Sequence, residues 1–202
     1  MEDNQSNKDY WNKLYQNNDT GWDIGYPSPA IREYIDQLQS KNLRILIPGC
    51  GNGHEAQHLL QSGFTDITLI DIAPSLTQAL AGRFGQFKDK VNIITGDFFE
   101  HEGRYDLILE QTFLSALAPA LRPAYAAKMH RLLAPGGKLV GVLFNKHFDE
   151  NPPYGGSEQE YRALFATHFA INILSPCYNS IDRRAGAEVF IHLSAKAINS
   201  SE

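Results

Sequence analysis

Cysteine is scarce in this chain of 202 residues. Its two cysteines, Cys50 and Cys177, are too few for a disulfide framework or for a zinc site built from cysteine alone. The histidines show no metal-binding spacing, because His54 and His58 are separated by one helical turn without an H-E-x-x-H pattern. We therefore predict no metal site, and the cysteine usage fits a reducing cytoplasm.

Positive charge and long apolar runs are also in short supply. The formal net charge of -5 argues against a broad surface for nucleic acid or anionic lipid. No segment approaches the roughly 18 apolar residues that a membrane-spanning helix needs, and the N-terminus lacks a cationic start and an apolar signal core. We expect a cytoplasmic protein that acts on a small molecule and binds neither membrane nor nucleic acid. Its oligomeric state leaves no mark on the sequence.

Strands and helices are predicted to alternate along the chain. After a polar N-terminal tail, Ser28 can cap a first helix with Pro29 in its first position, and Pro135-Gly136-Gly137 is expected to stop a later helix before a strand. The predicted strands cover residues 43–47, 67–70, 91–94, 105–109, 138–144, 170–174 and 187–195.

This alternation is typical of an α/β fold, in which a mostly parallel sheet carries helices on both faces and its crossovers are right-handed. The last two predicted strands are expected to form a closing antiparallel pair. We find no internal repeat, linker or low-complexity block. We therefore predict that residues 1–202 form a single domain.

The first predicted strand runs into the turn Pro48-Gly49-Cys50-Gly51-Asn52-Gly53. Three glycines let the backbone turn tightly and approach a ligand, and the helix that follows offers unpaired N–H groups. Asp71 ends the second strand, where a carboxylate can accept both hydroxyls of a ribose. The spacing differs from the G-x-G-x-x-G of dinucleotide enzymes, because His54 occupies the place of the third glycine. A tight turn without any ligand remains the alternative.

Two further strand ends carry polar and aromatic residues. Gly96-Asp97-Phe98-Phe99 follows the third strand and offers a carboxylate for an exocyclic amine and an aromatic wall for a purine. Glu110-Gln111-Thr112-Phe113 follows the fourth strand. Each segment alone could be a helix cap or part of the core. Their place at successive carboxyl ends of one sheet favours a nucleoside site.

These motifs resemble those of class I S-adenosylmethionine methyltransferases, and more narrowly the thiopurine S-methyltransferase family in its thiol and halide methyltransferase branch. The resemblance extends from about Tyr10 to Ala195. The segments that carry it are YWNKLY (10–15), GWDIGYPSP (21–29), IPGCGNGHE (47–55), GDFF (96–99) and PPY (152–154).

The resemblance implies a Rossmann-like domain with a seven-stranded, mostly parallel sheet, an antiparallel C-terminal strand and S-adenosyl-L-methionine as cofactor. Residues 1–26 would form an N-terminal tail and a lid over the cofactor, and Tyr154 would line the acceptor pocket or anchor its loop. Where plant thiol methyltransferases tend to have tryptophan and tyrosine, this chain has Tyr15 and Gln111. The implied cofactor-binding residues are Trp11, Tyr15, Trp22, Gly49, Gly51, Asp71, Ile72, Asp97, Phe98 and Gln111.

Methyl transfer from a sulfonium is an in-line displacement. A thiolate, a thiopurine, a halide or thiocyanate then needs alignment and exclusion of water rather than a general base. We therefore expect a small soft nucleophile as acceptor. Two alternatives stay open: a methyltransferase for an O- or N-centred metabolite, and a cofactor-binding module without activity.

Two short segments allow more than one interpretation. Arg183 and Arg184 could place a cation near an anionic acceptor or could simply be solvated. Residues 151–154 spell the tetrapeptide of DNA amino-methyltransferases, but they follow the fifth predicted strand rather than the fourth. Their position and the acidic chain therefore argue against base methylation.

Overall fold

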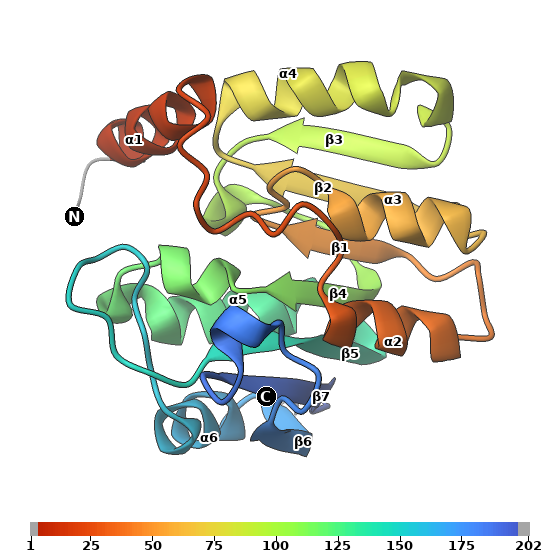
Figure 1. Ribbon diagram of the computed structural model, residues 1–202. Coiled ribbons are helices and arrows are strands. Elements are labelled where there is room, and N and C mark those ends of the chain that lie inside the picture. The colour runs from red at the N-terminus through yellow and green to blue at the C-terminus, as the bar shows by residue number, and fades with distance from the viewer. Residues whose placement is uncertain (1–3, 198–202) are drawn as a thin grey trace.

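The computed structural model describes residues 4–197, and within them seven strands form one sheet with helices on both faces (Figure 1). The order across the sheet is β3-β2-β1-β4-β5-β7-β6. The strands are β1 (Ile45–Pro48), β2 (Ile67–Asp71), β3 (Val91–Thr95), β4 (Tyr105–Gln111), β5 (Leu133–Phe144), β6 (Phe169–Pro176) and β7 (Glu188–Ala195).

Strand direction follows the prediction. Strands β1 to β5 pair in parallel, and β7 lies antiparallel between β5 and β6. Every residue of β1 and β2 is buried, which fits their mainly apolar sequences, since a parallel strand is covered on both faces. The α/β fold class and the closing antiparallel pair are therefore confirmed.

Helices cover the sheet in two groups. The α-helices are α1 (Asn4–Gln16), α2 (Pro29–Gln37), α3 (His54–Gln61), α4 (Pro74–Arg83), α5 (Arg122–Leu132) and α6 (Glu158–Ala166). Because side chains alternate along a strand, Ile45 and Ile47 join the core beneath α2, α3 and α4, while Leu46 joins the core beneath α5 and α6. Each face of the sheet thus has its own apolar layer.

Helix α1 was not predicted, because its sequence reads as a polar tail. A helix of this length is marginal in water on its own. Here Trp11 and Tyr15 pack against the core, and the Asn12 side chain accepts a hydrogen bond of 2.8 Å from the backbone N–H of Ser75 in the first turn of α4. Tertiary contacts therefore stabilise α1 where its own pattern of apolar residues is weak.

Two further expectations are wrong in detail. The Ser28 side chain does not cap α2; instead its backbone N–H donates to Glu55 Oε1 at 2.9 Å, while Pro29 does occupy the first position. Strand β5 begins at Leu133 rather than 138 and continues through the Pro-Gly-Gly segment. Its pairing with β4 shifts register between Tyr105 and Leu107, which accommodates that segment within the strand.

Candidate functional site

A cavity of about 810 Å³ lies at the carboxyl ends of the central strands. The cavity is lined by Gly49, which follows β1, and by residues 111–113, which end and follow β4. Strand order reverses between β1 and β4, and such a switch point is where open α/β sheets bind ligands. The volume is within the range of small-molecule sites.

The glycine turn after β1 is tightly packed against the opposite wall. Gly49 has a φ of +56°, and a Cβ at this position would lie 2.2 Å from the ring of Phe113. Gly51 also has a positive φ, of +51°, but its surroundings are open by comparison, with the Tyr15 hydroxyl 3.6 Å from an added Cβ. Gly49 lines the cavity, whereas Gly51 lies behind it and donates its N–H to Asp71 Oδ2 at 3.4 Å.

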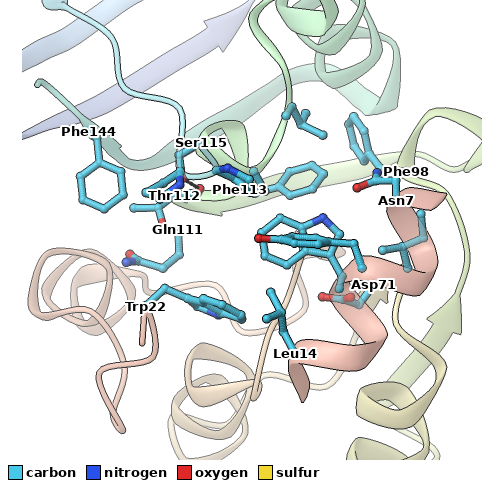
Figure 2. Close-up of a pocket in the computed structure, with 18 of the residues that line it drawn as sticks. Asn7, Leu14, Trp22, Asp71, Phe98, Gln111, Thr112, Phe113, Ser115 and Phe144 are labelled. Atoms are coloured by element: carbon cyan, nitrogen blue, oxygen red, sulfur yellow. Dashed lines mark hydrogen bonds between the residues drawn. The ribbon is translucent and has the colours of Figure 1, made fainter. Parts of the chain in front are cut away.

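Asp71 ends β2 with its carboxylate at the cavity wall (Figure 2). Burial raises the pKa of this carboxyl to about 6, and hydrogen bonds from backbone N–H groups oppose that shift. One of these bonds comes from Ala73 at 3.1 Å. Near pH 7 the side chain is therefore mainly an ionised acceptor, as recognition of ribose hydroxyls requires.

The segment after β3 supplies the next part of the wall. Asp97 accepts a hydrogen bond of 2.9 Å from the Phe99 N–H and so caps the 3-10 turn η2 (Phe98–Glu100). Phe98 is buried and packs edge-on against Phe99 and Phe113 while also facing the cavity. Asp97 thus caps a turn and Phe98 fills the core, while both residues also line the cavity; their contact with a purine stays a prediction. Ile72 lines the same wall.

Three aromatic rings from the N-terminal segment cover the cavity. Trp22 packs edge-to-face against Trp11 and Tyr15, with ring centroids 5.4 and 5.7 Å apart. Burial raises the pKa of Tyr15 above its usual range, so its phenol stays neutral. We call residues 10–26 the lid. Asp23 ties the lid to the glycine turn through His54 Nε2, at 2.9 Å, and the side chain of Asn52.

The side of the cavity opposite Asp71 is formed by other residues. In Figure 2, Asp71 and Phe98 are on one side of the cavity, and Gln111 and Phe144 are on the other. The Gln111 Oε1 atom is buried without a hydrogen-bond partner in the described chain. We call this side the acceptor half. Its lining residues include Gln111, Ser115, Ala116, Leu117, Phe144, Lys146, Phe148, Pro152, Pro153 and Arg184.

The sequence predicted more of the cavity-lining residues near Asp71 than of those in the acceptor half. Tyr154 is not among the cavity-lining residues; its backbone N–H donates to the Ser115 carbonyl at 2.6 Å, while the two preceding prolines do line the cavity. Ser115, Phe144 and Phe148 were missed. Their only signal was their position at or shortly after the carboxyl ends of β4 and β5.

Glu110 lies beneath the acceptor half, with no exposed surface. Its Oε1 accepts hydrogen bonds from the N–H groups of Phe113, at 2.5 Å, and Leu114, at 3.3 Å, and its Oε2 accepts one from the Tyr125 hydroxyl. These contacts hold the 3-10 turn η3 (Phe113–Ala116), which begins after Thr112 in a left-handed conformation with a φ of +57°. Glu110 was missed as a support of the site.

Glu110→Gln is expected to flatten the dependence of stability on pH. Burial raises the pKa of Glu110 to about 7, from 4.5. Between these values the native state holds a proton that the unfolded state releases, so the free energy of unfolding increases as pH falls from 7 to 4.5, by about 2 kcal/mol. Urea unfolding of both proteins from pH 5 to 8 measures the difference, and parallel curves would contradict this assignment.

Two further findings concern the part of the chain that the structure describes. Between residues 4 and 197, no cluster of histidine, cysteine, aspartate and glutamate is arranged to hold a metal ion. Within the same range, no helix has the length and apolar character needed to cross a bilayer.

The switch-point cavity, the glycine turn and the buried carboxylate at the end of β2 define a Rossmann-like domain with a ligand cavity at its carboxyl edge. The family model of thiopurine S-methyltransferase matches residues 6–190. The chain belongs to the thiopurine S-methyltransferase family, and this family match makes it an S-adenosylmethionine-dependent methyltransferase.

Individual relatives agree with this family. A probable thiol methyltransferase 2 of Arabidopsis thaliana is 32% identical over 76% of this chain and 70% of its own length. Thiocyanate methyltransferase 1 of Brassica oleracea is 31% identical over 88% and 81%. In structure, a Burkholderia thailandensis 1,6-didemethyltoxoflavin-N1-methyltransferase superposes with a TM-score of 0.73 over 94% of this chain and 87% of the other, at 20% identity. That likeness supports the fold.

Proposed function

We propose that this enzyme transfers the methyl group of S-adenosylmethionine to a small soft nucleophile: a thiol, a thiopurine, thiocyanate or a halide. The observation that carries the proposal is a cavity with two unlike halves: one has an ionised carboxylate and a glycine turn, and the other combines apolar and aromatic side chains with the cations Lys146 and Arg184. The names of the plant relatives, thiol and thiocyanate methyltransferase, support the same class of acceptor.

For the cofactor, we assign the half of the cavity around Asp71. Its carboxylate would accept both ribose hydroxyls, and Gly51 supports it from behind. Gly49 would lie against the methionine part, and its lack of a side chain lets the turn pack directly against the Phe113 ring. Ile72, Asp97 and Phe98 would surround the adenine, and Gln111 would reach the cofactor across the cavity, from the acceptor half at the end of β4 (Figure 2).

The chain's contribution to the reaction is alignment and exclusion of water. The bound cofactor supplies an electrophilic methyl group on a sulfonium. Trp11, Tyr15 and Trp22 cover the cavity, and aromatic faces favour a cationic group near them. A soft anion attacks the methyl carbon with its own electron pair while the bond from that carbon to sulfur breaks, so no proton has to be removed. Alignment of this kind can lower a barrier by several kcal/mol.

Four broader assignments accompany this proposal. The whole chain acts as one domain, with residues 1–26 as tail and lid, although residues 1–3 lie outside the described part. The enzyme works in the cytoplasm without a metal, in keeping with two free, buried cysteines. Nucleic acid is not its partner, in keeping with the net charge of -5. Tyr154 acts as a loop anchor beside the acceptor half through its backbone bond to Ser115.

A panel of acceptors tests the proposed function. Purified protein is incubated with labelled S-adenosylmethionine and, separately, iodide, thiocyanate, hydrosulfide, a small thiol, a thiopurine and a catechol, and the methylated products are identified. Turnover is expected with one or more of the sulfur or halide nucleophiles. Turnover of the catechol alone would refute the soft-nucleophile assignment.

A further inference from the structure

Arg184 is a charged residue buried between the lid and the acceptor half. It ends the 3-10 turn η5 (Asp182–Arg184) just before β7, and 8% of its surface is exposed. Of the two alternatives that the sequence leaves open for this loop, simple solvation does not hold for Arg184. Its guanidinium faces the Phe144 ring, 5.2 Å from the centroid, and both residues line the cavity.

Two hydrogen bonds fix the guanidinium of Arg184. Its Nη2 donates to the backbone carbonyl of Trp22 in the lid at 2.7 Å, and its Nη1 donates to Glu188 Oε1 at 3.3 Å. Glu188 is itself buried, with 4% of its surface exposed. Removing an ion pair from water costs much of the free energy that the pairing returns, so stability alone is a weak reason for this arrangement.

Neighbouring contacts bind the lid from both sides. Arg183 Nη2 donates to the carbonyl of Asp23 at 3.2 Å, so η5 holds two successive lid carbonyls. The Asp23 carboxylate contacts His54 and Asn52 beside the glycine turn. The chain around Trp22 is thus attached to the cofactor half through Asp23 and to the acceptor half through Arg184.

We propose that Arg184 is a positioning residue that couples binding in the acceptor half to closure of the lid over the cofactor. The inference rests on the proposed function. Arginine has five N–H donors, so the guanidinium can hold the Trp22 carbonyl and Glu188 and still meet an anionic acceptor in the cavity. An acceptor at this place therefore stabilises the closed lid.

Glu188 has a distinct part in this arrangement. Its carboxylate offsets the charge of Arg184, which would otherwise repel the sulfonium cation in the same cavity. Glu188→Gln is accordingly expected to weaken binding of cationic S-adenosylmethionine several-fold more than binding of neutral S-adenosylhomocysteine. A purely structural role of the ion pair would weaken both ligands equally.

Tryptophan fluorescence provides a direct reading of the lid, because the chain has two tryptophans and both, Trp11 and Trp22, belong to it. In Arg184→Gln we expect the emission of the complex with S-adenosylhomocysteine to shift to longer wavelength and the dissociation constant to rise about tenfold. With an acceptor that the wild type methylates, kcat/KM is expected to fall about 100-fold. Arg184→Lys keeps the charge but not the planar donor arrangement, and should recover only part of the loss.

Arg44→Gln is the control. Arg44 lies just before β1, at the amino ends of the strands and away from the cavity, and its guanidinium pairs there with Asp106. The coupling would be overturned if Arg184→Gln and Arg44→Gln showed the same tryptophan emission and the same affinity for S-adenosylhomocysteine. If Arg184→Gln loses its fold in circular dichroism, Glu188→Gln decides: equal weakening of the two ligands refutes the proposal. If the wild type methylates no acceptor of the panel, the proposed function fails, while fluorescence and the binding constants still decide whether Arg184 holds the lid.

Discussion

Asp71→Asn is expected to raise the dissociation constant for S-adenosylmethionine about 100-fold. Hydrogen bonds to a charged group contribute roughly 1.5–3 kcal/mol each, and two ribose hydroxyls would bind this carboxylate. The amide side chain retains the size of the carboxyl group but has one acceptor oxygen instead of two, so it cannot accept from both hydroxyls and from the N–H groups of Ala73 and Gly51. Isothermal titration calorimetry measures the change.

The same carboxyl predicts how cofactor binding depends on pH. Because the pKa of Asp71 is about 6, the acceptor form predominates at pH 7 and above. Affinity should be highest there and weaken as pH falls through 6, since the protonated acid accepts less well. Asp71→Asn should remove this dependence. Asp106→Asn, at the opposite edge of the sheet, is the control and should bind as the wild type does; an unchanged affinity in Asp71→Asn itself would refute the ribose assignment.

The order of strands and helices could be predicted because local pattern and tertiary burial agree in the central sheet. Residues 67–71 are apolar apart from Thr68 until the strand ends at Asp71, and that charged residue marks the point where the strand reaches the cavity. Helix α1 could not be predicted in this way. Its contacts, such as the bond between Asn12 and Ser75, join residues far apart in the chain and leave no periodic signal.

The same distinction applies to the site. Residues that end or closely follow a strand, such as Asp71 and Asp97, are placed by the topology of a parallel sheet and were expected at its edge. The acceptor half is assembled from long loops, and the bond between Arg184 and Trp22 joins positions 162 residues apart. A motif such as residues 151–154 indicates that this loop matters without indicating which of its residues faces the cavity.

Gly49→Ala is expected to have the second large effect, because two physical costs coincide at this position. A φ of +56° costs a residue with a Cβ about 1–2 kcal/mol, and the new methyl group would overlap the Phe113 ring. We expect the free energy of unfolding to fall by about 3 kcal/mol, the melting temperature to fall by roughly 8 °C, and the affinity for S-adenosylmethionine to fall at least tenfold. Thermal unfolding and calorimetry measure these changes.

Two further variants separate backbone strain from steric overlap at Gly49. Gly51→Ala has a similar φ but an open neighbourhood, so it should show the strain alone and destabilise less than Gly49→Ala. In Gly49→Ala/Phe113→Ala the overlapping ring is gone, so the double variant should be more stable than the sum of the two single changes predicts. Additive changes would mean that the turn relaxes without touching Phe113. In that case, the close packing between the ends of β1 and β4 does not hold the glycine turn in its cofactor-binding conformation.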